Sequence, residues 1–275
     1  MPMSPLSVAV GIFIVACLFT WIASLVTHEH SWVDRLWSIL PAIYVWVFTI
    51  ASGFHSVLLN GMAVLVTLWG ARLTFNFARK GGYSGVEDYR WPVVRARMNR
   101  WQFEIFNILF IVIFQNMLLA LIAMPALLVY QNAMDPITVG GVILLVLFAL
   151  CLIGEVVADE QQWSFQQAKR AVLNAGGTPS ANFIQTGLWS ISRHPNYFCE
   201  IVMWWLVFLM GVVASGTFFQ WTIAGPVLLT ALFVGSTRLT EQISLSKYPE
   251  YADYQRSTSA VIPWFRRRAQ VGSAA

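Results

Sequence analysis

The chain has 275 residues, of which 57% are hydrophobic and 11% are charged, and its formal net charge is +4. A soluble domain is typically about one quarter charged, so this composition excludes an ordinary soluble globular protein. The basic balance does not require nucleic acid as a partner, because Lys and Arg beside apolar segments are typical anchors at anionic lipids. The cysteines (Cys17, Cys151 and Cys199) are scattered and lack the spacing of metal ligands.

Long apolar segments predict seven membrane-spanning helices, because uncharged apolar runs of about 18 or more residues are typical of such helices. The expected spans are residues 5–26, 36–52, 56–78, 103–130, 138–158, 198–215 and 217–236. The first run does not read as a cleaved signal peptide, since no Lys or Arg precedes it. We therefore expect an all-α integral membrane protein, with one seven-helix bundle over residues 1–265 and a disordered basic tail over 266–275.

The distribution of Lys and Arg predicts the orientation of these spans. If the N-terminus lies outside, the segments 27–35, 79–102 and 159–197 and the chain after residue 236 all lie inside. These segments hold all but one of the 17 Lys and Arg residues, and the exception, Arg72, lies within the third span. Because cytoplasmic loops are enriched in Lys and Arg, we expect an outer N-terminus and a cytoplasmic C-terminus.

The first inner segment ends in Asp34 and Arg35, just before the second span. Asp34 has two open interpretations. It can cap the helix that follows it. Alternatively, it can share or donate a proton at the edge of a membrane cavity, where desolvation favours the neutral form of an acid.

Polar residues follow one face at the end of the third span. Arg72, Asn76 and Arg79 are spaced i, i+4 and i+7, so a helix places them on the same side. A guanidinium inside an apolar run is costly unless it is paired or faces a polar cavity. The turn-rich stretch "GGYSGVEDYRW", which contains Tyr89, follows. Arg and aromatic residues near glycines suit the binding of phosphates and rings.

The end of the fifth span repeats this spacing with acceptors. Glu155, Asp159 and Gln162 are again i, i+4 and i+7. These side chains can accept hydrogen bonds from ribose hydroxyls or amides. The alternative is a helix that leaves the membrane with a solvated polar face, and the spacing alone does not decide between the two.

The stretch "GLWSISRHPNYFCEI" enters the sixth span. Pro195 is expected at the first turn of that helix, where a missing backbone N–H costs least. Arg193 and His194, just before it, can donate to phosphates or amide carbonyls at a rim that a helix N-terminus also makes favourable for anions. Asn196 and Glu200 are i and i+4 and face the same way. An acid inside a span is a functional candidate, the alternative being an interfacial Arg–Glu pair.

The region after the seventh span contains two further patterns. Arg238 and Glu241 leave the span on one helical face. Tyr248, Tyr251 and Tyr254 recur every third residue. The tyrosines can form a packing stripe on a short amphipathic helix, or a ring that closes over a flat ligand.

Together these motifs resemble one known family. "GLWSISRHPNYFCEI", with "EVVADEQQWSF" before it and "KYPEYADYQRSTSAVIPWF" after it, resembles the bacterial branch of the steroid 5-alpha-reductases over roughly residues 30–265. The resemblance implies a bacterial inner-membrane enzyme. This enzyme would use NADPH to reduce the C4–C5 double bond of a 3-oxo-Δ4-steroid or a related lipid enone.

The resemblance also implies roles for individual residues, with the cofactor-binding half at about 139–265. Asn196 would contact the nicotinamide, Asp159 the sugar or adenine part, and Arg72 and Arg79 the phosphates. All the implied cofactor contacts are Arg72, Arg79, Glu155, Asp159, Gln162, Arg193, His194, Asn196, Tyr197, Glu200, Arg238, Glu241, Tyr251 and Tyr254. No metal ligand and no nucleic acid is implied.

The catalytic pair departs from the family pattern. The mammalian members are thought to use a Glu and a Tyr at the ketone, where charge that builds on the oxygen needs a donor. This chain offers Asp34 in the second-span region, and Trp69 rather than a Tyr in the third. We expect Asp34 to act as the ketone-side acid, with Tyr89 as a weaker candidate.

Two alternatives stay open. An S-adenosylmethionine-dependent isoprenylcysteine or phospholipid methyltransferase shares the Arg-His-Pro-X-Tyr pattern. It usually has fewer spans and two adjacent acids after the last span, whereas Glu241 is followed by Gln242. The other alternative is a non-catalytic sterol- or lipid-binding membrane protein. A transporter is disfavoured, because the polar residues gather on one side and no inverted repeat is evident. The sequence predicts no oligomeric state.

Overall fold

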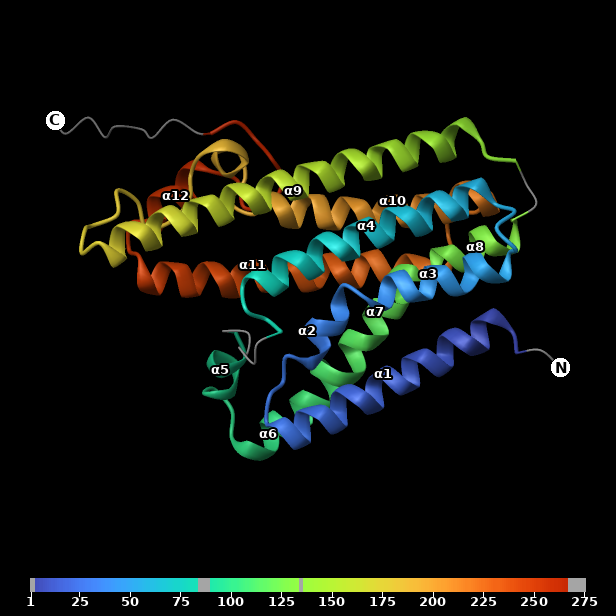
Figure 1. The fold of residues 1–275 in the computed structure, drawn as a ribbon, viewed down its shortest axis with the longest axis horizontal. Helices are drawn as coiled ribbons and strands as arrows, with labels where there is room; N and C mark the ends of the chain where they lie inside the picture. The colour runs from blue at the N-terminus through green and yellow to red at the C-terminus, as the bar shows by residue number, and fades with distance from the viewer. Residues whose placement is uncertain (1–2, 84–89, 134–135, 267–275) are drawn as a thin grey trace. The chain divides into compact units, whose positions relative to one another are not determined.

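The computed structural model describes residues 3–83, 90–133 and 136–266, and this part of the chain consists of helices and their connections, without strands (Figure 1). It contains seven helical segments long and apolar enough to cross a membrane. They are α1 (Pro5–Thr27); α2 (Trp32–Trp37) with α3 (Leu40–Ala51); α4 (Val57–Arg79); α6 (Arg100–Phe106), η1 (Asn107–Phe114), α7 (Gln115–Ala123) and α8 (Pro125–Gln131); α9 (Val139–Asn174); α10 (Pro195–Ser215); and η3 (Trp221–Ile223) with α11 (Ala224–Lys247). The shorter elements are α5 (Arg90–Arg95), η2 (Gly187–Ser190) and α12 (Tyr251–Ser257).

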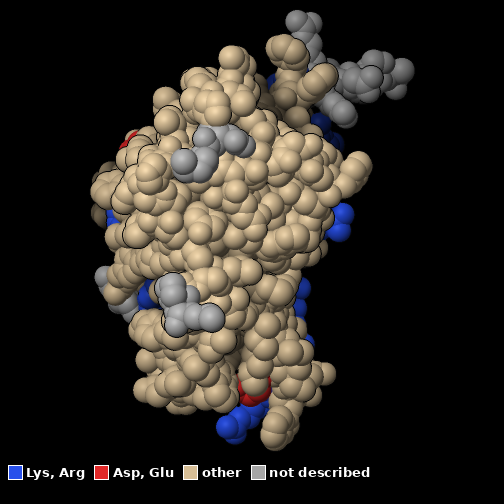
Figure 2. All heavy atoms as spheres, turned by 90° about the vertical axis from the view of Figure 1, so that its right-hand side faces the viewer, with Lys and Arg blue, Asp and Glu red and all other residues tan. Residues whose placement is uncertain are grey.

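The outer surfaces of the spanning helices fit a lipid environment. On α1, large apolar side chains such as Val10, Val15 and Val26 are half or more exposed. The face drawn in Figure 2 is mostly uncharged, with Lys and Arg at its margins. Exposed apolar surface on this scale marks an interaction surface, and a bilayer satisfies it along helices of spanning length. The protein is therefore a multi-pass membrane protein.

Two helices continue well beyond the apolar runs that predicted them. We expected the fifth span to end near residue 158 and the seventh near 236, but α9 extends to Asn174 and α11 to Lys247. At 1.5 Å per residue, the 36 residues of α9 span about 54 Å, against a hydrocarbon core of about 30 Å. The inner segment expected from residue 159 therefore begins as a continuation of α9, because good helix formers carry the helix on after the apolar run ends.

The second span begins earlier than expected and is broken between α2 and α3. Gly70 of α4 lies against this break, where a Cβ would lie 2.3 Å from the carbonyl oxygen of Ser38. The Ser38 hydroxyl is also 2.7 Å from the Thr74 hydroxyl one turn later. A glycine is therefore required where α4 touches the exposed backbone of the break.

The fourth span is irregular. Its π-helical segment η1 is followed by α7 and α8, which meet at Pro125, and a proline inside a helix removes one backbone hydrogen bond. Two buried amides fasten this span to α1. Asn107 Nδ2 donates to Ser24 Oγ over 3.2 Å and Asn116 Nδ2 to Thr20 Oγ1 over 3.1 Å. Polar pairs of this kind hold helices together in an apolar medium.

The chain divides into two compact units, and the division falls within α9, α10 and α11. Unit 1 contains residues 1–148 and 204–229, and unit 2 contains residues 149–203 and 230–275. The core of unit 1 is aromatic, with Trp69 and Trp204 in edge-to-face contact at 4.9 Å and Tyr44 and Phe48 fully buried. Unit 2 contains most of the polar residues singled out by their spacing.

Candidate functional site

The connector before α10 is held against α9. Gly187 begins the η2 turn at φ +62°, a left-handed conformation that favours glycine. A Cβ at this position would lie 2.5 Å from Gln161 Nε2. Gln161 Oε1 in turn accepts a hydrogen bond of 2.9 Å from the Leu188 amide, and Trp189 Nε1 donates to the Ala158 carbonyl over 3.1 Å. The start of the motif "GLWSISRHPNY" is thus fixed before the helix begins.

The helix then starts as the sequence indicates, with Pro195 as the first residue of α10. Ser192 supports the turn into it. Its Oγ accepts from the His194 amide at 3.2 Å and donates to the Val261 carbonyl over 2.7 Å. Trp264, further along, donates its amide to the carbonyl of Ile191 over 2.9 Å. Residues 255–264, which we call the C-terminal segment, therefore lie against the entry to α10.

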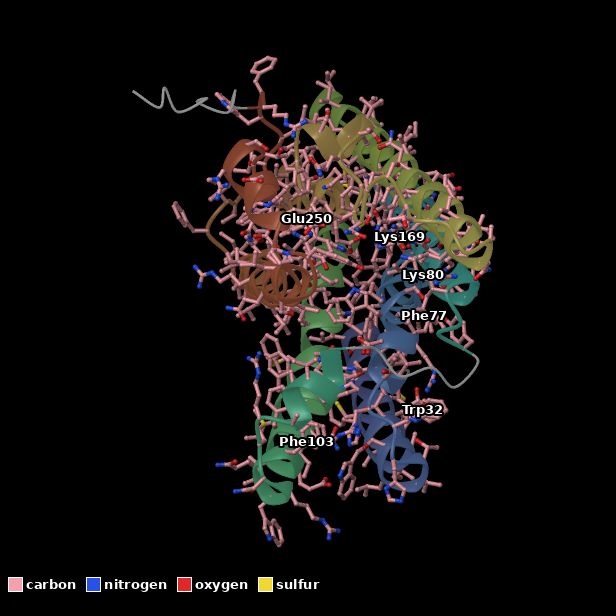
Figure 3. The ribbon with its side chains drawn as sticks, turned by 90° about the vertical axis from the view of Figure 1, so that its left-hand side faces the viewer. Trp32, Phe77, Lys80, Phe103, Lys169 and Glu250 are labelled. Carbon is pink, nitrogen blue, oxygen red and sulfur yellow. The ribbon has the colours of Figure 1, made fainter. Side chains whose placement is uncertain are left out.

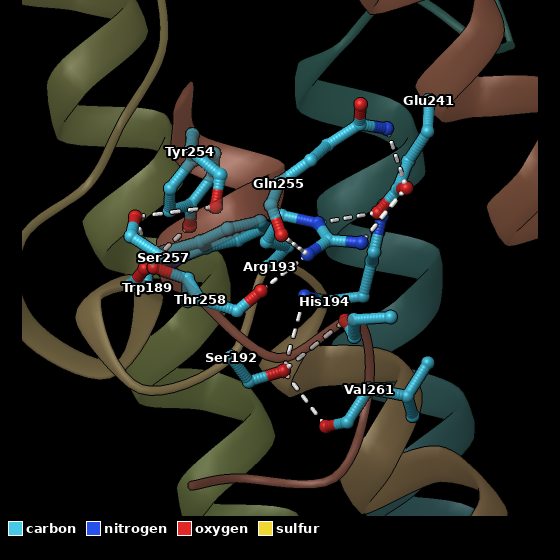
Figure 4. Close-up of polar contacts among 11 residues, drawn as sticks. Trp189, Ser192, Arg193, His194, Glu241, Tyr254, Gln255, Ser257, Thr258 and Val261 are labelled. Atoms are coloured by element: carbon cyan, nitrogen blue, oxygen red, sulfur yellow. Dashed lines mark hydrogen bonds and ion pairs between the residues drawn. The ribbon is translucent and has the colours of Figure 1, made fainter. Parts of the chain in front are cut away.

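Arg193 is the centre of this docking (Figure 4). Its Nε and Nη2 donate to the two carboxylate oxygens of Glu241 over 2.7 and 2.9 Å. Its Nη1 donates to the carbonyl of Gln255 over 3.0 Å and also to that of Thr258. The Arg193 amide donates to the Ser259 carbonyl over 2.8 Å. The fork geometry of a guanidinium suits such a bidentate pair with a carboxylate.

This arrangement changes the role expected of Arg193. The sequence places it at a polar rim, but its side chain is buried and most of its donors are already used within the chain. An Arg–Glu pair of the kind considered for this helix does form, between Arg193 and Glu241. Arg193 thus joins α10, α11 and the C-terminal segment.

His194 continues the network on the same side of α10. Its Nε2 lies 3.1 Å from Glu241 Oε1, and its ring stacks on that of Tyr197 with centroids 5.0 Å apart. Tyr197 packs edge-to-face on Phe233 at 4.7 Å. Glu241 also accepts from Gln255 Nε2 over 2.9 Å. The side of α10 that carries His194 and Tyr197 therefore faces α11.

A second stripe of α10 faces α9. At the contact of these helices, a Cβ on Gly154 would lie 3.1 Å from Cys199 Sγ. Glu155 and Glu200 each follow these contact residues directly, and they are 3% and 4% exposed. Both acids are therefore buried beside the crossing of α9 and α10.

The remaining polar residues of this interior include atoms with unused hydrogen-bonding capacity. Asp159 is buried one turn after Glu155, as the spacing predicts. Within the described part of the chain, the buried Gln162 Oε1 and Asn196 Oδ1 have no hydrogen-bond partner. Buried polar atoms are nearly always satisfied in proteins, so this interior is suited to a polar ligand or water.

The tail tyrosines form a packing stripe. Tyr251 and Tyr254 are buried on α12, and both contact the ring of Phe183, with centroids 4.9 and 5.6 Å apart. The Tyr254 hydroxyl donates to the Trp189 carbonyl. Burial raises the pKa of both phenols, so they remain neutral donors. Of the two interpretations of this pattern, these contacts favour packing.

A group of hydrogen bonds on the surface of unit 2 joins the loop after α9 to the start of α12. Lys169 Nζ donates to the Asn182 carbonyl over 2.7 Å and to the Tyr248 hydroxyl over 3.2 Å. Asn182 Nδ2 donates to Glu250 Oε1 over 2.6 Å, and this bond lowers the pKa of Glu250. Figure 3 labels Lys169, on α9, and Glu250, just before α12.

A cavity of about 390 Å³ opens beside Arg193. Residues 255–260 supply its polar wall, and Trp264 and Phe265 supply aromatic rings. Hydrogen-bonding groups beside flat apolar surfaces suit a polar, partly planar ligand. Among the described residues, no group of three His, Cys, Asp or Glu side chains is arranged to hold a metal ion.

Unit 1 contains the other residues singled out from the sequence. Asp34 is not a helix cap, because Ser31 occupies the capping position of α2; instead, Asp34 Oδ2 accepts from Trp91 Nε1 over 3.0 Å. Arg72 is half-buried. Arg79 Nε donates to the buried Asn76 over 2.8 Å, which confirms their shared face.

Two further predicted residues need separate mention. Tyr89 lies outside the described residues. In unit 2, Arg238 is exposed whereas Glu241 is buried, so their shared helical face does not give them a shared environment.

The sequence did not indicate several residues that belong to the polar interior of unit 2. Gln255 and Thr258 contact Arg193, and Ser192 supports the same turn, but none of them stands at a spacing that would single it out in the sequence. Thr237 and Thr240 of α11 were also missed. Their hydroxyls are buried without a hydrogen-bond partner among the described residues, and a threonine inside an apolar helix gives no signal of this kind.

These features define the class as a multi-pass helical membrane protein with a buried, hydrogen-bonded polar centre in unit 2. Residues 20–258 match the family described as "Protein of unknown function (DUF1295)", and the chain belongs to that family. An uncharacterized protein of the fission yeast Schizosaccharomyces pombe is 37% identical over 258 residues, covering 88% of this chain and 75% of the yeast protein. No solved structure matches the chain. Because this relative is eukaryotic, the similarity does not assign the chain to a bacterial membrane.

Proposed function

We propose that this protein is a membrane reductase that uses NADPH to reduce the C4–C5 double bond of a 3-oxo-Δ4-steroid or a related lipid enone. The observation that carries the proposal is the polar interior of unit 2. There, Asn196 and Gln162 present buried acceptors without a partner among the described residues. The same unit contains the buried acids Glu155 and Asp159. The motif resemblance to the steroid 5-alpha-reductases supplies the identity of the cofactor.

The residues fit a dinucleotide in part. The free Oδ1 of Asn196 suits the amide N–H of a nicotinamide carboxamide, and the carboxylates of Asp159 and Glu155 suit ribose hydroxyls. Arg193 does not fit the phosphate contact expected from its sequence position, because Glu241 and two backbone carbonyls use its donors. We therefore assign Arg193 the role of a positioning residue. The phosphate contacts of Arg72 and Arg79 come from the motif resemblance alone.

The protein contributes orientation and electrostatics to this chemistry. When bound, NADPH supplies the hydride that the β-carbon of the enone accepts. Negative charge then develops on the ketone oxygen, where a hydrogen-bond donor stabilises it. We assign the proton at this oxygen to Asp34. The apolar helices provide a lipid-soluble substrate with a route from the bilayer.

The orientation is part of the same proposal. The Lys and Arg distribution supports an outer N-terminus and a cytoplasmic C-terminus. A bacterial inner membrane follows only from the branch that the motifs resemble. Whether or not the membrane is bacterial, this orientation gives a water-soluble cofactor access from the cytoplasm.

A methyltransferase is a poorer fit for a specific reason. In the methyltransferases that share the Arg-His-Pro-X-Tyr pattern, acids after the last span hold the methionine amine of the cofactor. Here Glu241 already accepts hydrogen bonds from Arg193 and Gln255 and lies against His194. Its carboxylate has little capacity left for an amine.

Cofactor binding gives the direct test. The purified protein in detergent should change the fluorescence of NADPH and should not bind S-adenosylmethionine in a calorimetric titration. Asn196→Ala should weaken NADPH binding about tenfold, in line with one lost hydrogen bond, and abolish turnover at unchanged folded yield. Asn132→Ala, which removes an amide bonded to the Leu128 carbonyl in unit 1, is the matched control. Binding of S-adenosylmethionine instead of NADPH would end the reductase proposal.

The substrate side is tested with Asp34→Asn. Asparagine keeps an acceptor for Trp91, so the folded yield should persist while the transferable proton is lost. We expect the rate of NADPH consumption with 3-oxo-Δ4-steroids and simple cyclic enones to fall at least a hundredfold, with nearly unchanged NADPH affinity. An equal loss of rate and affinity would make Asp34 structural.

A further inference from the structure

The hydroxyl of Thr237, like that of Thr240, lacks the bond that four other helical threonines make. Thr20, Thr27, Thr49 and Thr67 each donate to the carbonyl four residues earlier, over 2.7 to 2.9 Å. This bond satisfies a threonine hydroxyl inside an apolar helix. Thr237 is 6% exposed, and its Oγ1 makes neither this bond nor another within the described residues.

The position of Thr237 shows what its side chain faces. Phe233 and Glu241, one turn before and one turn after it on α11, contact Tyr197 and His194 of α10. A residue midway between two such contacts lies on the same side of its helix. Thr237 therefore lies on the stripe that faces α10, at the level of residues 194–197. Asn196, whose Oδ1 is also without a described partner, belongs to this level.

The two residues offer complementary chemistry. A threonine hydroxyl can donate, and a side-chain amide oxygen only accepts. A carboxamide presents the matching pair, an acceptor oxygen and an N–H donor on one planar group. Buried polar atoms without partners are unfavourable, so a ligand that satisfies both at once would be bound selectively.

We propose that Thr237 is a cofactor-binding residue, whose hydroxyl donates to the carboxamide oxygen of a nicotinamide ring while Asn196 Oδ1 accepts from the carboxamide nitrogen. This inference rests on the proposed function and adds the donor half of the recognition. The stacked rings of His194 and Tyr197 lie at the same level of α10.

Thr237→Val tests the proposal, because valine keeps the shape and removes the hydroxyl. In detergent, we expect it to raise the dissociation constant for NADPH about three- to tenfold, the value of one neutral hydrogen bond. The thermal midpoint without cofactor should stay the same or rise, because an unsatisfied buried hydroxyl has been removed. Thr237→Ser should bind as the wild type does.

Thr49→Val is the matched control, since Thr49 is fully buried and its hydroxyl bonds the Val45 carbonyl. It should leave the dissociation constant unchanged. A cofactor analogue with an acetyl group in place of the carboxamide separates the two partners, because it keeps the carbonyl and lacks the N–H. The penalty of Asn196→Ala should disappear with this analogue, and that of Thr237→Val should persist.

The possible failures are distinguishable. If the wild type binds NADPH and Thr237→Val binds it equally well, the inference is overturned while the reductase proposal stands. Loss of the Thr237→Val penalty with the acetyl analogue would also overturn it, since the hydroxyl would then not contact the carbonyl. If the wild type itself fails to bind NADPH, both proposals fall together.

Discussion

Glu241→Gln should loosen the attachment of the C-terminal segment to α10. The carboxylate accepts four hydrogen bonds, two from Arg193 and one each from His194 and Gln255. Glutamine keeps the shape of the glutamate side chain, but only one of its two terminal atoms is an acceptor oxygen. The other is an N–H₂ group, which would face the donors that the second carboxylate oxygen now accepts from. The buried guanidinium of Arg193 would also lose its counter-charge. Removing one partner of a buried ion pair typically costs about 3 to 5 kcal/mol.

Hydrogen exchange locates this effect. The Trp264 amide, which bonds the Ile191 carbonyl, reports directly on the docking of the C-terminal segment. A loss of about 3 kcal/mol should speed the exchange of that amide roughly a hundredfold, since each 1.36 kcal/mol is a factor of ten. Peptides of α3 and α4 in unit 1 should exchange as in the wild type, because the network lies within unit 2.

Glu250→Gln is the control for a lost carboxylate on the same part of the chain. Glu250 is exposed and bonds only the Asn182 amide among the described contacts, so its exchange pattern should be unchanged apart from its own loop. The reasoning is refuted if Glu241→Gln leaves both the Trp264 amide and the thermal midpoint as in the wild type. That result would mean that Arg193 holds the segment through its backbone contacts alone.

Two further predictions concern the connector and its support. Gly187→Ala should lower the thermal midpoint by more than Gly176→Ala. Both glycines have positive φ, but only a Cβ at 187 meets a neighbour, the Gln161 side chain; equal losses would show that Gln161 moves aside freely. The stability of the wild type should fall as pH rises above about 10, the usual phenol pKa, because burial raises the pKa of Tyr254 and only the unfolded chain then releases its proton. Tyr254→Phe should flatten this alkaline limb in melts between about pH 8 and 11, and an identical limb would assign the loss to other groups.

The sequence predicted the spans well where one physical signal dominates. A continuous apolar run is required to cross a bilayer, so all seven crossings could be located from composition alone. An apolar run cannot indicate where a helix ends once it has left the membrane. Residues after 158 in α9 are polar, and only their helix propensity and the packing of the connector extend the helix to Asn174.

The buried polar positions of unit 2 were predicted as far as helical spacing reaches. The face of Glu155 and Asp159 and the start of α10 at Pro195 follow from local periodicity, and both are confirmed. The partners of Arg193 were beyond this reasoning. Glu241 is 48 residues away along the chain, and the carbonyls of Gln255 and Thr258 are backbone groups that any residue type supplies. Contacts of this kind depend on tertiary packing, which a single sequence does not encode locally.

The Arg193 network has a consequence for the biosynthesis of the protein. The ribosome synthesises Gln255, Thr258 and Ser259 only after the seventh helix. Until then Arg193 and Glu241 lack the hydrogen-bond partners that these residues supply. Chains generally fold in the order of their synthesis, so the centre of unit 2 must be one of the last parts to mature. A chain that ends at Lys247 would contain all seven spanning helices but lack the carbonyls of Gln255 and Thr258 that bind Arg193.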